Sequence, residues 1–383
     1  MKTQLVWIDP GLMESFQLEG SPADRTRLDR LLLPAAEALR AGELVAFPTE
    51  TVYGLGANAL DADAVAKIFA AKGRPGDNPL IVHVAHAADI EPLTTGLTSL
   101  ARRLLEAFAP GPLTLILPRS AHVPDIVTAG LDTVAVRIPA HPVARRLIEL
   151  AGLPVAAPSA NTSGRPSPTR AWHVEEDFSG LIPYIIDGGS CEFGLESTVL
   201  DLTDETPTIL RPGAITQDMI DSVIGKRSDH ARKQGHASAR APKSPGMKYR
   251  HYAPKARLVI CNQTSSLERA ACLLAHLVQA GWQSDPSAQT EPEFGLYICQ
   301  DTLAEFLQLA ELAHQADLPS GLALEIYAEH PDAQAASHHL FNALRSFDRR
   351  GMRLILAEGL PLQGHGLAYM NRLDKAAGGG EPV

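Results

Sequence analysis

The stretch LVAFPTETVYGLGANA, residues 44–59, joins a short apolar run to a polar loop. The run at 44–47 predicts a short buried strand, because four apolar residues are followed at once by turn formers. The loop after it begins at Pro48 and carries Thr49, Glu50 and Thr51. Polar side chains at the end of a buried strand are typical of ligand sites in α/β proteins. The stretch therefore predicts an α/β fold with a site at a strand end.

More apolar runs and helical patterns follow in alternation. Runs rich in Val, Ile and Leu predict strands at 80–84, 113–117, 134–138, 155–157, 184–187 and 198–202. Apolar residues at helical spacing predict helices at 27–40, 62–72, 98–108 and 142–150, with Asp61 as the N-cap of the second. This alternation predicts a sheet covered by helices.

The composition changes after Ile224. The following thirty or so residues are polar, basic and rich in Ser, Ala, Gly and Pro, which is typical of a linker. Apolar patterns then resume, with strands predicted at 257–261, 294–299, 321–328 and 352–358 and helices at 267–280 and 333–349. We predict a large α/β domain at 1–224, a basic linker at 225–256, a smaller α/β domain at 257–377 and a disordered tail at 378–383.

Charge is unevenly distributed along the 383 residues, which carry a net charge of −10. Residues 226–257 contain ten Lys or Arg and one acid, Asp229, so the rest of the chain is strongly acidic. A globally acidic protein with one basic strip is not built as a nonspecific nucleic-acid binder. The strip is either a solvated linker or a local contact for phosphate, and the sequence leaves both open.

The sequence favours a cytoplasmic protein. Its N-terminus shows no apolar signal segment, and no run of 18 apolar residues predicts a membrane helix. The four cysteines form no CxxC pair, so we expect reduced, mostly structural thiols. His338, His339 and His365 lack metal-site spacing, and we expect no metal site made by the protein itself.

The glycines of residues 54–59, GLGANA, fit the GxGxxA dinucleotide fingerprint. That fingerprint opens directly off a strand, whereas residues 49–53 intervene here. We therefore interpret these glycines as a tight bend beside a ligand and not as a cofactor loop.

Several cations lie where they could meet an anion, although a loop Lys or Arg is more often solvated. Lys72 and Arg74 are one residue apart and are stiffened by Gly73 and Pro75, which suits phosphate or carboxylate. Arg137 lies late in an apolar strand, where it is costly unless it meets an anion.

Hydroxyl and amide side chains occupy other loops: PSANTSG at 158–164, LEST at 195–198 and RPG at 211–213. Each segment alone is equally explained by a cap, a turn or a solvated cation. Taken together, cations and polar donors on separate loops predict a site for an anionic, polyphosphate-bearing ligand.

The ordered motifs FPTETVYGL (47–55), KGRPGDNPL (72–80), VRIP (136–139), APSANTSGRPSPT (157–169) and ESTV (196–199) are similar to the YrdC-type domain of threonylcarbamoyl-AMP synthases. SPGMKYRHYAP (244–254) and NRLDKAA (371–377) resemble the longer, two-domain form of that family. The resemblance covers nearly the whole chain. It implies a YrdC-like twisted mixed sheet with a deep cleft, plus a smaller Rossmann-like α/β C-terminal domain.

The resemblance also implies roles for residues of these motifs. L-threonine would be bound by Thr51, His83, Arg137 and Ser197, with Arg137 clasping the carboxylate. Catalysis would rest on Lys72, Arg74, Ser159 and Asn161. The ATP site would comprise Arg74, Asn78, Thr133, Ala157, Ser159, Ser167, Arg211, Tyr249 and Tyr252, with one linker tyrosine closing over the nucleotide.

The reaction implied by the resemblance joins L-threonine, bicarbonate or CO2, and ATP into threonylcarbamoyl-AMP, and releases pyrophosphate. The product serves the threonylcarbamoyladenosine modification of tRNA beside the anticodon, through downstream transfer proteins. Mg2+ would travel with ATP, since no dedicated carboxylate cage is visible in the sequence. No residue stands out as general base for the threonine amine.

Alternatives remain open at this stage. A YrdC-type RNA-binding module, with at most a weak tRNA contact, is one, although the net charge argues against tight binding. A different carbamoyl transfer, as in hydrogenase-maturation proteins, would require zinc-finger cysteines that the chain lacks. The basic linker is either a lid that excludes water or a passive tether.

Overall fold

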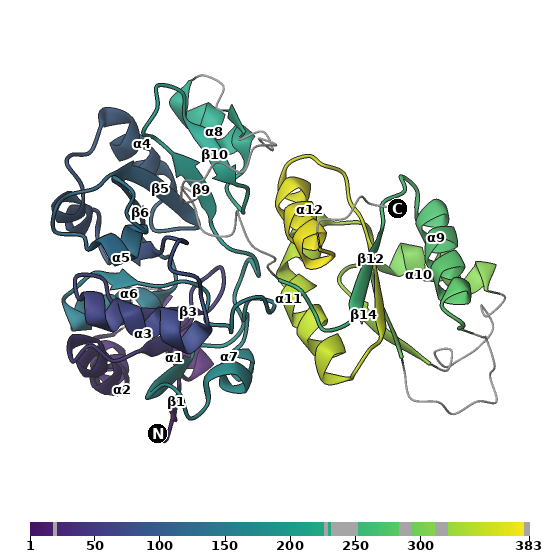
Figure 1. Ribbon diagram of the computed structural model, residues 1–383, viewed down its shortest axis with the longest axis horizontal. Helices are drawn as coiled ribbons and strands as arrows, with labels where there is room; N and C mark the ends of the chain where they lie inside the picture. The colour runs from purple at the N-terminus through teal and green to yellow at the C-terminus, as the bar shows by residue number, and fades with distance from the viewer. Residues whose placement is uncertain (18–20, 226–228, 231–251, 283–292, 311–320, 379–383) are drawn as a thin grey trace. The chain divides into compact units, whose positions relative to one another are not determined.

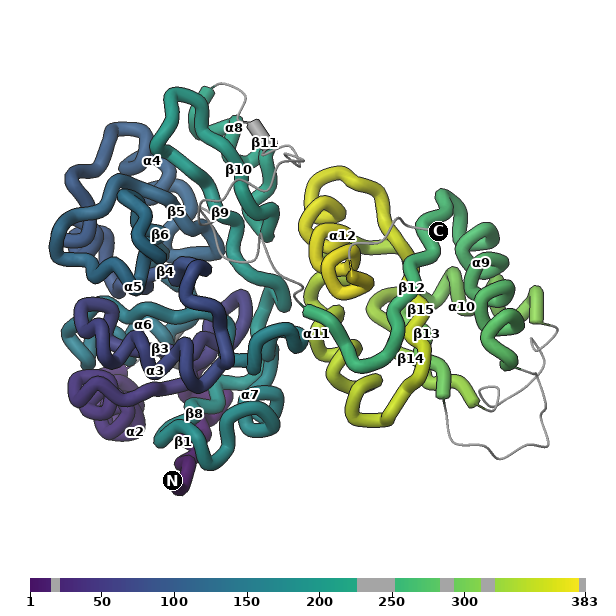
Figure 2. The backbone as a smooth tube through the Cα atoms, viewed as in Figure 1, coloured from purple at the N-terminus to yellow at the C-terminus, as the bar shows by residue number. Residues whose placement is uncertain are grey.

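The computed structural model describes residues 1–17, 21–225, 229–230, 252–282, 293–310 and 321–378. The chain divides into two compact units (Figures 1 and 2). Of the described residues, the first unit contains 1–163 and 167–230, and the second contains 164–166 and 252–378. Most of the predicted linker, including Tyr249, and the predicted tail beyond residue 378 lie outside the described residues.

The first unit is built on a mixed 11-stranded sheet with the order β1-β8-β2-β3-β7-β4-β6-β5-β9-β10-β11. The strands are β1 (Gln4–Trp7), β2 (Val45–Phe47), β3 (Gly54–Asn58), β4 (Ile81–His83), β5 (Leu113–Pro118), β6 (Thr133–Arg137), β7 (Val155–Ala156), β8 (Tyr184–Asp187), β9 (Thr198–Asp201), β10 (Thr208–Arg211) and β11 (Asp229–His230). The seven strands predicted for this unit are all present, and the α/β class is confirmed.

Helices cover both faces of this sheet (Figure 1). They are α1 (Pro10–Gln17), α2 (Pro22–Arg40), α3 (Ala62–Lys72), η1 (Ala87–Leu93), α4 (Ser99–Phe108), α5 (Asp125–Thr128), α6 (Pro142–Ala151), α7 (Ala171–Phe178) and α8 (Gln217–Ile224). Successive residues of a strand face opposite sides, so Val45 and Phe47 pack in the cluster of α2 and α6 while Ala46 packs in the cluster of α3 and α4. The two apolar layers hold the sheet between them.

Helix α3 shows how local sequence positions a site residue. Asp61 caps its N-terminus by accepting hydrogen bonds from the amides of Asp63 and Ala64, as predicted. Gly73 ends the helix with a positive φ of 59°, a conformation that suits glycine. Because the helix buries one apolar face against the sheet, its last residue, Lys72, is drawn into the interior.

The interpretation of Gly54 and Gly56 as a tight bend is wrong. Both lie in the extended strand β3, which pairs with β2 and β7. A Cβ on Gly56 would lie 2.7 Å from the Phe47 ring and 2.8 Å from Val155. These glycines are therefore explained by close packing of neighbouring strands and not by backbone freedom.

The second unit is a parallel sheet with the order β12-β15-β13-β14 (Figure 2). Its strands are β12 (Arg257–Cys261), β13 (Phe294–Ile298), β14 (Leu322–Ile326) and β15 (Leu354–Glu358), and its helices are α9 (Ser266–Gln279), α10 (Gln300–Leu309), α11 (Ala333–Arg349) and α12 (His365–Ala376). The smaller α/β domain is thus confirmed, although the sequence analysis missed α10 and α12. No helix of the described residues is long and apolar enough to cross a membrane.

Candidate active site

Strand register places three polar residues in one row across the first sheet. His83 at the end of β4 pairs with Arg137 at the end of β6, and Arg137 pairs in turn with Thr114 of β5. All three are buried. Two of the residues predicted to bind threonine, His83 and Arg137, are therefore neighbours.

Arg137 is held by groups of its own chain. Its Nη2 donates to Oε1 of Glu50 at 2.6 Å, its Nη1 to the Thr51 hydroxyl at 2.9 Å and its Nε to the Gly111 carbonyl at 3.2 Å. The Arg137 and Glu50 side chains are only 4% and 3% exposed. Glu50 thus supplies the anion that a buried Arg137 needs. Burial raises the pKa of the Glu50 carboxyl, but Arg137 outweighs burial and the pKa lies below its usual value.

The loop between β2 and β3 is shaped by Thr49. Its hydroxyl donates to the Val52 carbonyl at 2.6 Å and accepts from the amides of Thr51 and Val52. It also lies 2.9 Å from the Thr51 hydroxyl. This turn fixes Thr51, so that its hydroxyl meets Arg137.

Two buried histidines beside this ion pair are neutral at neutral pH. Burial and the charge of Arg137 lower the pKa of His83 to about 3. Its Nδ1 lies 3.2 Å from the Ile81 carbonyl, which accepts a hydrogen bond in the tautomer that carries the proton on Nδ1. Burial also lowers the pKa of His141, the residue before α6, to about 4.

Ser197 and Arg211 meet next to this row. The Ser197 hydroxyl lies 2.7 Å from the hydroxyl of Thr114 and accepts a hydrogen bond from Arg211 Nη2 at 3.1 Å. Arg211 Nε also donates to the Ser197 carbonyl at 3.0 Å. Thr114 thus links this pair to Arg137, its partner across the strands.

Lys72 reaches the loop after β7. Its Nζ donates to the carbonyls of Ser159 and Asn161, and the Ser159 hydroxyl donates to Oδ1 of Asn161 at 2.6 Å. The Ser159 backbone bridges to Gly54, directly after the Thr49 loop. The predicted catalytic residues Lys72, Ser159 and Asn161 therefore form one cluster that adjoins the threonine set through the backbone of β3.

Arg74 lies in the loop between α3 and β4. Its Nη2 donates to the carbonyls of Asn78 and Pro79 at 3.3 and 3.0 Å, so the guanidinium braces this turn. Oδ1 of Asn78 is buried and has no hydrogen-bond partner among the described residues. A buried acceptor without a donor is uncommon and marks a place where a ligand donor or water can bind.

Thr133 and Ala157 lie on the same side as Asn78. Ile81 is the first residue of β4, and it pairs with Ala135 of β6, two residues after Thr133, where β6 begins. The amide of Ala157 donates a hydrogen bond to the Ile81 carbonyl. Thr133 is therefore about 13 Å along its strand from Arg137, at roughly 3.3 Å per residue. Of the predicted ATP residues, Asn78, Thr133 and Ala157 lie toward one end of the central strands, whereas Arg211 lies with Ser197 beside the row of His83 and Arg137.

Ser167 and the two tyrosines complete the predicted set. The Ser167 hydroxyl donates a hydrogen bond to Glu196 Oε1 at 2.5 Å. Glu196 directly precedes Ser197 in the chain. Tyr252 belongs to the second unit, where its ring packs 5.1 Å from that of Phe341. Tyr249 lies outside the described residues, so a tyrosine that closes over a nucleotide stays a prediction.

The sequence analysis assigned no role to four residues that support this site: Glu50, Thr114, His141 and Glu196. Glu50 could have been found, because a lone carboxylate in a loop between two apolar strands is a natural partner for a buried arginine. Thr114 could not, because its role depends on strand order, which brings residue 114 beside residue 197.

Comparisons with known proteins show the family of this chain. The family described as "Telomere recombination" matches residues 37–213, and the family "Threonylcarbamoyl-AMP synthase, C-terminal domain" matches residues 215–378. The threonylcarbamoyl-AMP synthase of Pyrococcus abyssi is 46% identical over 344 residues, which are 90% of this chain and 93% of that protein. This chain belongs to the threonylcarbamoyl-AMP synthase family.

Other members of the family are similar over different lengths. The threonylcarbamoyl-AMP synthase of Bacillus subtilis is 47% identical over 92% of this chain and 94% of its own length. The crystal structure of P. abyssi Sua5 complexed with L-threonine has a TM-score of 0.78 at 45% identity, and covers 91% of this chain and 95% of that one. A Cellvibrio japonicus threonylcarbamoyl-AMP synthase, 35% identical, covers only 46% of this chain but 93% of its own length. This chain has the longer, two-domain form.

Proposed function

We propose that this chain joins L-threonine, bicarbonate or CO2, and ATP into threonylcarbamoyl-AMP with release of pyrophosphate. The proposal rests above all on one observation: the polar loops of the first unit converge, with Lys72, Ser159 and Asn161 in one cluster and Thr51 and Arg137 in the next. The family to which the chain belongs and the L-threonine bound to P. abyssi Sua5 support it. As a nucleotidyltransferase, the enzyme would need to hold an amino acid beside a nucleotide.

Threonine would bind at Thr51, His83, Arg137 and Ser197. Arg137 uses three of its five N–H groups on Gly111, Thr51 and Glu50, which leaves two for the threonine carboxylate. Glu50 would hold the guanidinium in place, because its low pKa keeps it ionised at neutral pH. The neutral His83 would add no positive charge near the threonine ammonium group.

ATP would bind at the other end of the central strands, along Arg74, Asn78, Thr133, Ala157 and Ser159. The unpartnered Oδ1 of Asn78 is a suitable acceptor for an N–H group of the nucleotide. Lys72, Arg74 and Arg211 would place fixed positive charge near the phosphates, with Asn161 and Ser167 as further contacts. Closure by Tyr249 or Tyr252 belongs to the same proposal.

The chemistry asks for alignment and charge more than for covalent help. The threonine nitrogen forms a bond to the carbon of CO2 and loses a proton to give a carbamate. With bicarbonate, a C–O bond of bicarbonate breaks in the same step and water leaves. A carbamate oxygen then bonds to the α-phosphorus of ATP while the bond to the bridging oxygen breaks, and pyrophosphate leaves. Lys72 would stabilise charge in that step, and its two carbonyl contacts in a buried place support this role.

Mg2+ would come with the triphosphate, whose oxygens are the hard ligands that it prefers. The two carboxylates of the described site are already engaged, Glu50 by Arg137 and Glu196 by Ser167. They fit a role in holding the site together better than a role as magnesium ligands. The ion would neutralise phosphate charge when bound.

In the cell, the product would serve threonylcarbamoyladenosine formation in tRNA, through downstream transfer proteins in the cytoplasm. The buried free thiols Cys191, Cys261 and Cys299 suit a reducing compartment. A direct tRNA contact would be weak, given the net charge of −10.

The test is pyrophosphate release by the purified full chain with Mg-ATP. Release should require L-threonine and should rise with added bicarbonate, and threonylcarbamoyl-AMP should be identified by mass spectrometry. Pyrophosphate release that is unchanged without threonine, or none at all under these conditions, would contradict the proposal. A salt-titrated tRNA-binding assay on the same sample addresses the RNA-binding alternative.

A further inference from the structure

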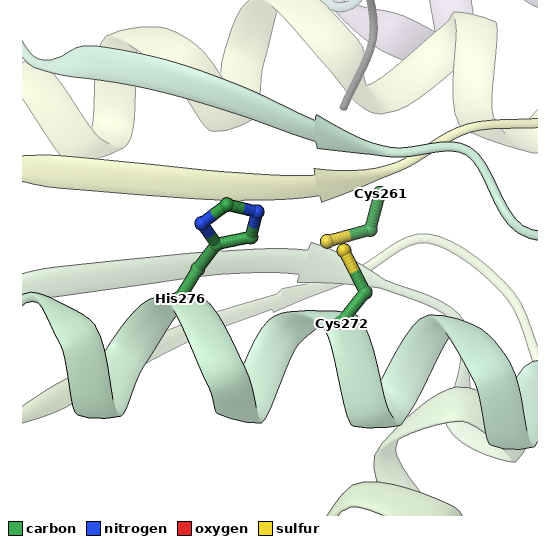
Figure 3. Close-up of side chains that lie close together, drawn as sticks. All are labelled: Cys261, Cys272 and His276. Atoms are coloured by element: carbon green, nitrogen blue, oxygen red, sulfur yellow. The ribbon is translucent and has the colours of Figure 1, made fainter.

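A cluster of soft ligand atoms lies in the second unit, apart from the site above. It consists of Cys261, the last residue of β12, and of Cys272 and His276 on α9. Figure 3 shows both sulfur atoms and the imidazole in the space between strand and helix. The ligand atoms all lie within 4.8 Å of one another. We propose that these three residues form a binding site for a thiophilic divalent cation, with Zn2+ as the best-fitting ion.

The placement follows from the fold. Cys272 and His276 are four residues apart on a helix, so both side chains leave the same face of α9. That face packs on the sheet through Leu273 and Leu277, which brings both residues to the end of β12. Two ligands from one helical turn and one from a facing strand give a preformed arrangement.

The distances between the three ligand atoms suit zinc after a small movement of the side chains. With Zn–S near 2.3 Å and Zn–N near 2.0 Å, ligand atoms of a tetrahedral site lie about 3.5–3.8 Å apart. From an upper limit of 4.8 Å, the distance between each pair of ligand atoms has to shorten by about 1.3 Å at most. Cys272 and His276 are half-buried, so their side-chain torsions can supply that movement without disturbing the core.

Charge also favours a divalent ion. Two thiolates with one divalent cation make a neutral complex, which burial tolerates. Arg269 and Glu358 of the same unit form an ion pair of their own at 2.9 Å.

A packing role does not account for all three residues. Cys261 alone is explained as a small buried core residue. The ring of His276, however, makes no hydrogen bond or ion pair with any described residue, although it points at two thiols. Half-buried soft donors that converge on one point are typical of a metal site. The fourth position would be taken by water, as at zinc sites with three protein ligands.

Zinc binding to the reduced full chain tests the proposal. We expect one equivalent of Zn2+ in competition with a chromophoric chelator, release of about two protons per ion, and a thiolate-to-metal absorption band when Co2+ replaces zinc. Zinc should also raise the Tm of unfolding by about 3 °C or more. Cys272→Ser and His276→Ala should each weaken zinc binding at least about tenfold.

Matched variants separate this cluster from other residues of the same kinds. Cys299→Ser and His338→Ala, which change a thiol and an imidazole of the same unit outside the cluster, should bind zinc as the unchanged chain does. The proposal is overturned if zinc fails to bind one-to-one, if Co2+ gives no thiolate band, or if Cys272→Ser and His276→Ala leave the affinity unchanged. A disulfide between Cys261 and Cys272 in reduced, metal-treated protein would also overturn it.

Discussion

Among the described residues, the buried ion pair Arg137–Glu50 of the first unit and the buried ion pair Arg269–Glu358 of the second differ in what surrounds them. In the second unit, Glu358 accepts from Arg269, from the Thr302 hydroxyl and from the Cys299 amide, while Arg269 also donates to carbonyls of the loop before α9. In the first unit, Arg137 keeps N–H groups to spare beside residues of the family motifs. A saturated pair holds a fold together, whereas an unsaturated pair is prepared for a ligand.

The largest effect is expected from breaking the saturated pair. Arg269→Met leaves Glu358 buried without its cation, which should lower the free energy of unfolding by about 3–5 kcal/mol. The readout is chemical denaturation of the full chain, followed by the signal of Trp282 in the core of the second unit. Glu358→Gln, which keeps the shape, is the matched control and should cost less. Equal losses for both variants would mean that charge pairing matters little there.

Removing the cation of the predicted catalytic cluster should come next. Lys72→Met should lower kcat for pyrophosphate release by about 100- to 1000-fold, because a fixed positive charge near the phosphates is lost. Lys67→Met is the control on the same helix, since Lys67 pairs with Glu43 at the surface. A kcat within about threefold of the unchanged chain would remove Lys72 from the catalytic set.

Arg137→Met tests the unsaturated pair itself. The KM for threonine should rise by about 10- to 100-fold, because a charged hydrogen bond to the carboxylate is lost, while the KM for ATP should change much less. Arg269→Met, assayed below its Tm, should leave the threonine KM within about twofold. If both arginine variants raise it alike, the distinction between the two pairs fails.

The effect that is smallest near neutral pH is expected in the pH dependence of stability. His83 has a folded pKa of about 3 and an unfolded pKa near 6.5, so the unfolded chain binds the proton first as pH falls. Stability should therefore fall by about 1.4 kcal/mol per unit below pH 6.5 on account of this group. His83→Gln should flatten the profile between pH 6.5 and about 4.5. His141 contributes in the same direction, so some slope should remain.

Below that window the carboxylate of the first pair takes over. Glu50 has its pKa lowered in the folded state, so its stabilisation is present above the unfolded pKa and is lost as pH falls through the folded value. Glu50→Gln should remove this acid-dependent loss. Identical profiles for Glu50→Gln and the unchanged chain below pH 4.5 would contradict the pKa direction.

Much of the fold could be predicted from the sequence, because the apolar runs are short, strongly patterned and bounded by turn residues. The strands around Val82 and Val136 are examples. Strand β3 could not be predicted, because Gly54 and Gly56 have low strand propensity and are explained by the neighbouring Phe47 ring. Propensity is local, whereas the reason for these glycines is tertiary.

The site shows the same division. Lys72, Ser159 and Asn161 could be placed together through motifs, and their contacts bear this out. The pairing of Arg137 with Glu50 was not predicted, because a ligand was expected to supply the anion for this buried arginine. The cluster of Cys261 with Cys272 and His276 has no CxxC spacing and arises only when α9 packs on β12. Side chains from distant segments meet by topology, which a motif does not encode.

The most direct test of the central claim is a crystal structure of the full chain with L-threonine and a non-hydrolysable Mg-ATP analogue. We predict the threonine carboxylate within hydrogen-bond distance of Arg137 and the triphosphate within reach of Lys72 and Arg74, in one continuous site of the first unit. Threonine bound away from Arg137 and Thr51, or a nucleotide bound in the second unit instead, would contradict it.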